Sequence, residues 1–359
     1  MYKYSHGGNA AFENGKGEII DLSANINPLG MPKGVREAII RGIPDCEYYP
    51  DNFSGKLREK TAAFENVNPD WIFCGNGASD IIFRLPGALQ AKKVLVVSPT
   101  FLDYERSAVS NGAIVVRSIL SSDNGFAVNK TLIEDVKREK PELVFLCNPN
   151  NPTGFLTERE LIAELLECCL SIKSCVLVDE CFLDFAENAD DYTSKVFLER
   201  YPNLIVLKAF TKLFALPGIR LGYAICADME VLQRLYFHGA DWPVSNLSQL
   251  AGIAALDDAR DFLKKTAEYV SRERSIIEKE LTLLGYKVFE SRANFVFLQN
   301  PYPFDPASEL DRKGFRIRSC ENFPALDRSY YRIAVSKPEI NIRLLHAIEA
   351  ITKSREKRQ

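Results

Sequence analysis

Short apolar runs alternate with longer amphipathic segments through the middle of the chain. This alternation predicts a mostly parallel sheet wrapped by helices, because parallel strands of one sheet are joined by helical crossovers. In one helical segment, 156–172, Thr157 and Glu160 have the spacing of a capping box at the helix start. We expect an α/β fold whose seven-stranded sheet is built from the runs 71–74, 92–99, 113–120, 142–147, 174–180, 203–210 and 218–226.

The last third of the chain follows a different pattern. Apolar residues recur at helical spacing over 259–284, which predicts one long helix that bridges to a second domain. The runs that follow predict a small α+β domain of antiparallel strands with helices on one side. We therefore expect an N-terminal arm (1–41) that joins the small domain, a large domain (42–255) and the small domain itself (256–359).

Composition and charge narrow the classes of function. The chain has 359 residues and a formal net charge of -3, so no uniform field favours nucleic acid or acidic lipid. Its nine cysteines show no metal-binding spacing, and we expect them to be reduced. The first residues lack the apolar core of a secretory signal, and no apolar run is long enough to span a membrane. These features predict a cytoplasmic protein that acts on a small molecule.

Lys212 is the first candidate for chemistry, because it directly follows the apolar run 203–210 and so lies at a strand end. A lysine held out of bulk water can lose its proton and attack an aldehyde, whereas a solvated lysine stays protonated. Taken alone, Lys212 would be an ordinary surface lysine. However, Thr211 and Arg220 add a hydroxyl group and a cation beside the amine, and a phosphorylated aldehyde needs both.

Other polar residues follow the expected strands at the edge where open α/β sheets bind ligands. The segment 75–79 (GNGAS) predicts a glycine turn that feeds a helix N-terminus, which can bind an anion. Asn151 lies in an NPTG loop, Asp179 ends a strand, and Tyr104 lies near a helix start. Each signal alone is weak, since strand-end acids also cap helices and loop amides usually make turn hydrogen bonds.

Together these residues follow the order and approximate spacing of fold-type-I pyridoxal-phosphate (PLP) enzymes. Residues 209–223 of this chain resemble the segment that carries the Schiff-base lysine in those enzymes. The resemblance implies that Lys212 forms a Schiff base with PLP and that Asp179 keeps the ring nitrogen protonated. It also implies that Asn151 donates to the ring oxygen and that Tyr104 stacks on the ring. The residues implied to hold the cofactor phosphate are Gly77, Ala78, Ser79, Thr211 and Arg220, with Tyr49 reaching across the interface of a homodimer.

Over essentially its full length the chain resembles threonine-phosphate decarboxylases and, next to them, histidinol-phosphate aminotransferases. Phe182 favours the decarboxylases, because the aminotransferases typically have a tyrosine there. Ala209 departs from many relatives, in which a serine or threonine bonds the cofactor phosphate. The motifs that carry the resemblance are HGGN (6–9), SANINPLGMP (23–32), DECFLDF (179–185), WPVSNLSQLAG (242–252) and FRIRSCENFPALDRSYYRIAV (315–335).

The resemblance implies decarboxylation of L-threonine O-3-phosphate to (R)-1-amino-2-propanol O-2-phosphate in cobalamin biosynthesis. Arg318 and Arg332 are implied to bind the anionic ends of the substrate, while His6 and Asn27 approach its phosphate. Two functional alternatives share the cofactor: an aminotransferase for histidinol phosphate, and a decarboxylase for L-serine O-phosphate. A third is a non-catalytic module of the same fold, which the presence of Lys212 disfavours.

Overall fold

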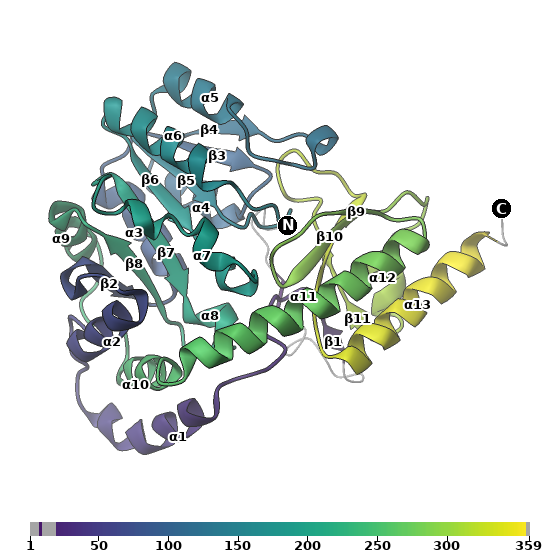
Figure 1. Cartoon of the computed structure of the whole chain (residues 1–359), viewed down its shortest axis with the longest axis horizontal. Coiled ribbons are helices and arrows are strands. Elements are labelled where there is room, and N and C mark those ends of the chain that lie inside the picture. Colours follow the sequence, from purple (N-terminus) through teal and green to yellow (C-terminus); the bar gives the residue numbers. More distant parts are fainter. Residues whose placement is uncertain (1–6, 9–18, 357–359) are drawn as a thin grey trace.

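Figure 1 shows the computed structural model, which describes residues 7–8 and 19–356. A large sheet with helices on both faces occupies one side, and a smaller sheet occupies the other. The long helix α11 (Ala259–Leu283) runs between the two, as the helical spacing over 259–284 predicted.

The large sheet has seven strands in the order β2-β8-β7-β6-β5-β3-β4. The pairs from β7 through β6, β5 and β3 to β4 are parallel, whereas β8 pairs antiparallel with β7 and with β2. The predicted α/β class and the mostly parallel sheet are therefore confirmed. The strands are β2 (Ile72–Gly75), β3 (Lys93–Ser98), β4 (Ile114–Ile119), β5 (Leu143–Cys147), β6 (Cys175–Asp179), β7 (Leu204–Ala209) and β8 (Gly222–Cys226).

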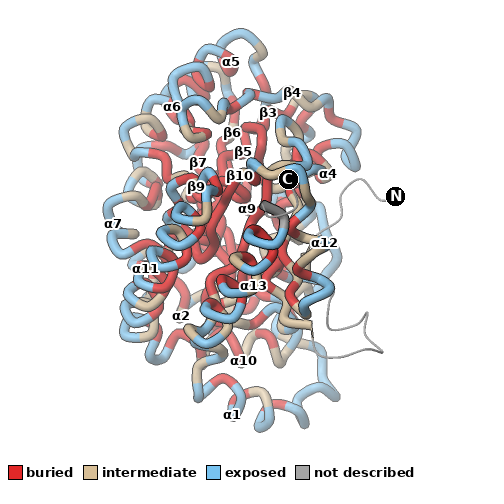
Figure 2. Tube along the Cα trace, turned by 90° about the vertical axis from the view of Figure 1, so that its right-hand side faces the viewer, coloured by how far each residue is buried: buried red, intermediate tan, exposed pale blue. Residues whose placement is uncertain are grey.

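Alternate residues of the central strands pack against two different helical layers. On β6, Leu177 joins a core with α3, α4 and α9, while Val176 and Val178 join the core on the opposite face. Side chains alternate across a strand, so both faces must be apolar when both are covered. Figure 2 shows these buried strands inside a shell of half-exposed helices. The helices are α1 (Lys33–Gly42), α2 (Gly55–Glu65), α3 (Ala78–Ala88), α4 (Leu102–Ser110), α5 (Thr131–Glu139), α6 (Arg159–Ser171), α7 (Ala189–Tyr192), α8 (Phe210–Leu213), α9 (Met229–Phe237) and α10 (Asn246–Ala255).

The smaller sheet has four antiparallel strands in the order β12-β13-β10-β9. The N-terminal segment lies against it: β1 (Ile20–Asp21) pairs in parallel with β11 (Phe315–Arg316), and Leu22 O accepts a 2.9 Å hydrogen bond from Ala334 N. The remaining elements are β9 (Lys287–Phe289), β10 (Phe295–Gln299), β12 (Arg318–Ser319), β13 (Tyr330–Ala334), α12 (Pro306–Asp311) and α13 (Pro338–Glu356).

The prediction of a capping box at the start of α6 is wrong. The helix begins at Arg159, and the residue before it, Glu158, makes no side-chain cap hydrogen bond. Instead, the side-chain oxygen of Asn148 accepts a 2.7 Å hydrogen bond from Thr157 N. The tertiary contact with the loop after β5 therefore replaces the local cap.

All nine cysteines are free, as expected from their spacing. Across residues 7–8 and 19–356, we find no helix that combines the length and the apolar character needed to cross a bilayer.

An aromatic cluster joins the two parts of the molecule. Phe126, in the segment between β4 and α5, is 2% exposed. Its ring centroid lies 5.2 Å from that of Phe289, 5.6 Å from Phe297 and 5.8 Å from Tyr330, all on the small sheet. One buried side chain of the large unit thus packs against three aromatic rings of the small sheet.

We expect Phe126→Ala to lower the free energy of unfolding by about 3–5 kcal/mol, because it leaves a cavity between the two sheets. Leu283→Ala is the control: Leu283 is 71% exposed at the end of α11, so its loss should cost about 0.5 kcal/mol or less. Urea unfolding monitored by circular dichroism measures both values. Equal stability of the two variants would contradict the proposed contribution of Phe126 to the packing between the two sheets.

Candidate active site

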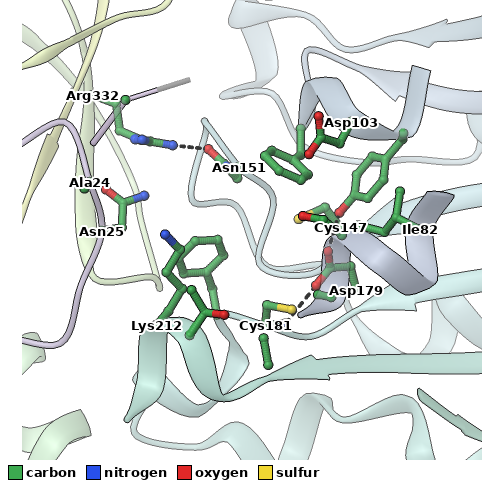
Figure 3. Close-up of a pocket in the computed structure, with 18 of the residues that line it drawn as sticks. Ala24, Asn25, Ile82, Asp103, Cys147, Asn151, Asp179, Cys181, Lys212 and Arg332 are labelled. Atoms are coloured by element: carbon green, nitrogen blue, oxygen red, sulfur yellow. Dashed lines mark hydrogen bonds between the residues drawn. The ribbon is translucent and has the colours of Figure 1, made fainter. Parts of the chain in front are cut away.

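One cavity of about 240 Å³ lies at the carboxyl ends of β5, β6 and β7, where the small sheet and the N-terminal segment meet them. Figure 3 shows Lys212, Asn151 and Arg332 directed into this shared space. The sequence-predicted residues that line it are Ala78, Ser79, Tyr104, Asn151, Asp179, Thr211, Lys212, Arg220, Arg318 and Arg332.

Lys212 lies in the single helical turn α8 that follows β7. The residue is half-buried because its side chain faces the cavity. Removal of the amine from bulk water and the positive charges of Arg332 and Arg220 lower the pKa of Lys212 to about 8. The Lys212 carbonyl accepts a 3.1 Å hydrogen bond from Asn27 N, which holds the turn in place. The amine can therefore become neutral near physiological pH.

Asp179 ends β6 and is buried on the side of the sheet covered by α4. Tyr104 donates a 2.6 Å hydrogen bond from its hydroxyl to Asp179 Oδ2, and Cys181 N donates one of 2.9 Å to Oδ1. Burial raises the pKa of the Asp179 carboxyl, although these donors oppose the shift. The Tyr104 ring is fully buried and stacks on Phe145 with centroids 4.9 Å apart.

An anion cradle forms where the turn before α3 meets the segment before β8. Gly77 has φ +81°, and a Cβ atom there would lie 2.8 Å from Arg220 Nη2. A Cβ atom on Gly222 would lie 2.5 Å from Ala78 N. Glycine is therefore required at 222 by close approach to backbone and at 77 by its left-handed conformation, and the two let the first turn of α3 and the Arg220 guanidinium face one volume. Ser79 and Thr211 complete this end of the cavity.

Two arginines enter the cavity from the small sheet. Arg318 on β12 is the direct register partner of Arg332 on β13. Arg332 is buried and donates to the Asn151 side-chain oxygen and, at 2.8 Å, to Ser23 O. Burial, with the positive charge of Arg318, lowers the Arg332 pKa to about 10. Two desolvated guanidinium groups side by side form a site for an anion, because like charges directly opposite each other are otherwise unfavourable.

Among the described residues, three predicted ones do not line the cavity: Gly77, which directly precedes the lining residue Ala78, Tyr49 and Asn27. Tyr49 is 80% exposed and stacks on Trp242 with ring centroids 4.6 Å apart. Asn27 is buried, and its amide donates to Leu213 O at 2.7 Å and to Thr266 Oγ1 at 2.9 Å. His6 lies outside the described residues.

Sequence reasoning missed part of the cavity wall. Ser23, Ala24 and Asn25 line it beside Arg332. With its amide oxygen turned toward Arg332, Asn25 accepts hydrogen bonds from Nε and Nη1, both at 3.3 Å. The polar run SANIN could have indicated this contact, since a buried amide in an irregular loop needs partners. The other unpredicted lining residues include Gly7, Ile82, Phe101, Asp103, Cys147 and Phe323.

Comparison with known proteins defines the class. Residues 17–348 match the family model "Aminotransferase class I and II", and the chain belongs to this family. It is 33% identical to the threonine-phosphate decarboxylase of Salmonella typhimurium, and the alignment covers 98% of this chain and 97% of that protein. It is 36% identical to a putative threonine-phosphate decarboxylase of Caldanaerobacter subterraneus, and the alignment covers 98% of this chain and 95% of that protein.

A solved structure gives the same picture for the fold. The histidinol-phosphate aminotransferase from Clostridium acetobutylicum superposes with a TM-score of 0.86 at 29% identity, covering 94% of this chain and all of that one. The expected resemblance to both groups of proteins is thus confirmed.

The lowered pKa of Lys212 can be measured in the protein without added ligand. We expect acylation of Lys212 to reach half its maximum near pH 8 rather than near the ordinary lysine value of 10.5, since the neutral amine is the reactive form. Arg332→Leu should move this midpoint upward, because it removes a neighbouring positive charge. Mass spectrometry of labelled peptides measures both, with the exposed Lys279 as the internal standard. A midpoint above pH 10 would contradict the electrostatic account.

Proposed function

We propose that this chain is a PLP-dependent decarboxylase that converts L-threonine O-3-phosphate to (R)-1-amino-2-propanol O-2-phosphate and carbon dioxide in cobalamin biosynthesis. Family membership and the two decarboxylase relatives support the proposal. The single observation that carries the choice of substrate is the pair Arg318 and Arg332, which lie opposite each other across β12 and β13.

The residues of the cavity suit PLP. The anion cradle between Gly77 and Arg220 would hold the phosphate, and Lys212 at the strand end would hold the cofactor covalently. Asp179 would face the ring nitrogen, where a cation relieves the unfavourable burial of its carboxylate. Asn151 would donate to the ring oxygen. When bound, PLP supplies an electron sink for the pair released at the substrate α-carbon.

Tyr104 has a constrained place in this arrangement. It lines the cavity, its ring already stacks on Phe145, and its hydroxyl bonds Asp179. The ring is fully buried, and Phe101 also contacts it edge-on with centroids 5.6 Å apart, so the proposed stacking of Tyr104 on the cofactor ring has little room in this structure. The hydroxyl would then keep Asp179 oriented toward the ring nitrogen.

Two cations suit a substrate with two anionic groups. Threonine phosphate carries a carboxylate and a phosphate, whereas histidinol phosphate carries a phosphate only. Charge-assisted hydrogen bonds contribute roughly 1.5–3 kcal/mol each, which is enough to select one substrate conformer when several converge. By fixing the carboxylate, Arg332 and Arg318 would determine which bond of the α-carbon is aligned for cleavage. Phe182, which lines the cavity without a hydroxyl group, supports the decarboxylase over the aminotransferase.

Lys212 would also supply the proton that completes the reaction. Its pKa of about 8 lets the amine exchange a proton near neutral pH, and it lines the same cavity as Arg318 and Arg332. A general acid works best when its pKa lies near the operating pH. Lys212 would therefore return a proton to the α-carbon after carbon dioxide leaves.

The proposal includes a homodimer with shared sites in the cytoplasm. Tyr49 would reach the cofactor phosphate of a second copy, which suits a ring that is exposed in the single chain. His6 remains a proposed neighbour of the substrate phosphate, whereas Asn27, whose amide is bonded to Leu213 and Thr266, would act through the backbone contact that holds Lys212. We retain the proposed arm (1–41), large domain (42–255) and small domain (256–359).

The second candidate is an aminotransferase for histidinol phosphate, which the structural likeness to the Clostridium acetobutylicum enzyme favours. We expect the PLP-loaded protein to release carbon dioxide from threonine phosphate and to form no glutamate from histidinol phosphate and 2-oxoglutarate. Mass spectrometry of the products identifies the reaction, and Lys212→Ala is the inactive control. Serine phosphate is the third substrate, because one methyl group changes specificity by only about 1–3 kcal/mol. Glutamate formation without carbon dioxide release would overturn the proposal.

Arg332→Ala should raise KM for threonine phosphate by about 10- to 100-fold, the loss expected for charge-assisted hydrogen bonds, while PLP stays bound. Arg328→Ala is the matched control, since Arg328 is an exposed arginine just before β13. Steady-state kinetics and cofactor retention on gel filtration measure the two effects. An equal loss of PLP and of substrate binding would contradict the assigned role of Arg332.

A further inference from the structure

A second cluster of charged residues lies at the same sheet edge, beneath the cavity, with Lys208, Glu65 and Glu180 buried and Asp184 and Lys195 half-buried. Lys208 Nζ lies 3.2 Å from Asp184 Oδ2, 3.7 Å from Glu65 Oε1 and 3.9 Å from Glu180 Oε2. Lys195 Nζ lies 2.8 Å from Glu65 Oε2. The side chains of Lys208, Glu65 and Glu180 are at most 6% exposed. None of these groups lines the cavity described above.

The cluster is fully engaged in polar contacts. Glu180 accepts hydrogen bonds of 2.8 Å from Thr193 Oγ1 and 2.6 Å from Ser194 N. Burial disfavours the charged form of Lys208, but the three neighbouring carboxylates outweigh this effect and raise its pKa above the usual range. The lysine is therefore a permanent cation.

Stability alone is a poor explanation for such a cluster. Removing several charges from water is costly, and a well-packed apolar replacement is often as stable or more stable. Three carboxylates also face only two ammonium groups among Glu65, Glu180, Asp184, Lys195 and Lys208. In some proteins such buried ionic groups are retained because they fix one geometry.

The positions of the members along the chain indicate which geometry this is. Glu180 directly follows Asp179, and side chains alternate along a strand, so the two carboxylates point to opposite faces of the sheet. Lys208 is on β7, four residues before Lys212 in the turn α8. Tyr223 on β8 pairs in register with Lys208, and its hydroxyl donates a 2.5 Å hydrogen bond to Glu65.

The backbone ladder ends where the cluster lies. The last register pair of β6 and β7 is Asp179 with Leu207, followed by the hydrogen bond from Glu180 N to Leu207 O. The last pair of β7 and β8 is Ala209 with Gly222. Beyond these points one further backbone hydrogen bond, from Phe210 N to Leu221 O at 3.1 Å, joins the β7 and β8 segments, and no further strand pairing of the described residues joins the β6 and β7 segments. Between the ends of β6 and β7, side-chain contacts such as those of Lys208 with Glu180 and Asp184 take over this role.

We infer that Lys208, with Glu65, Glu180 and Asp184, is a positioning network that fixes the strand ends carrying Asp179, Lys212 and Arg220 relative to one another. The inference rests on the proposed function, in which these three residues hold the ring nitrogen, the aldehyde carbon and the phosphate of one cofactor. The rigid cofactor meets all three contacts only if β6, β7 and β8 keep their relative positions at this edge. The network provides this constraint from the face opposite to the cofactor.

The test uses PLP as the probe and three variants of the full chain. Lys208→Met removes the shared cation, Glu180→Gln removes one carboxylate with little change in shape, and Lys208→Arg keeps the positive charge. Glu273→Gln is the matched control, because Glu273 is also a buried glutamate, and it accepts a 3.0 Å hydrogen bond from Asn341, far along α11. Thermal unfolding, PLP affinity and the visible circular dichroism of bound PLP are measured for each variant.

We expect Lys208→Met and Glu180→Gln to change the circular dichroism of bound PLP and to lower kcat by about 100-fold, as for a displacement on the order of 1 Å. Lys208→Arg should restore most of the signal. Glu273→Gln should lower thermal stability and leave the cofactor signal unchanged.

The inference is overturned if Lys208→Met and Glu180→Gln lose thermal stability while cofactor signal, PLP affinity and kcat stay at wild-type values. If Lys208→Met does not fold, Glu180→Gln and Lys208→Arg decide by the same criteria. A wild-type protein that forms no borohydride-stable link between PLP and Lys212 would instead overturn the proposed function, so the two failures are distinguishable.

Discussion

The chemistry of the site depends on the convergence of positive charges on one small cavity, which the fold has to hold together. Lys212, Arg220 and Arg332 face it from three different elements, and the two arginines contribute to the lowered pKa of the lysine. Mutual repulsion makes the arrangement unfavourable for the chain alone. It becomes favourable when anionic groups occupy the space, which is why the cavity suits a phosphorylated cofactor and a doubly anionic substrate. The chemistry of Lys212 and the binding of both ligands thus share one electrostatic origin.

The α/β sheet makes this convergence possible. Parallel strands deliver their following loops to a single edge, where Asp179 and Lys212 come together although they lie on different strands. The small sheet closes the cavity with Arg318 and Arg332, and the N-terminal segment adds Ser23. Aminotransferases and decarboxylases are both similar to this chain, so the reaction is decided by residues of the site and not by the fold. The inferred role of the buried network around Lys208 follows from this assembly, because a site built from several strands requires their ends to keep fixed relative positions.

Predictions from local pattern succeeded where one element decides the outcome and failed where several meet. The apolar runs formed strands because burial on both faces requires continuous apolar sequence. The cap expected at Thr157 failed because Asn148, from the neighbouring loop, bonds its backbone instead. Asn27, expected near the substrate, has its amide engaged by Leu213 and Thr266. In each case a contact from a distant part of the chain competed with the local preference.

The sequence by itself determined the α/β class, the position of Lys212 and Asp179 at strand ends, and the glycine turn before α3. Strand periodicity and turn chemistry are local properties of the chain. Only the tertiary structure decided that Arg318 lies opposite Arg332, that Ser23 and Asn25 contact Arg332, and that Glu65 bonds Tyr223 beneath the cavity. These contacts join residues far apart in the chain. They follow from strand register and from the packing of separate elements, which no local pattern of hydrophobic and polar residues encodes.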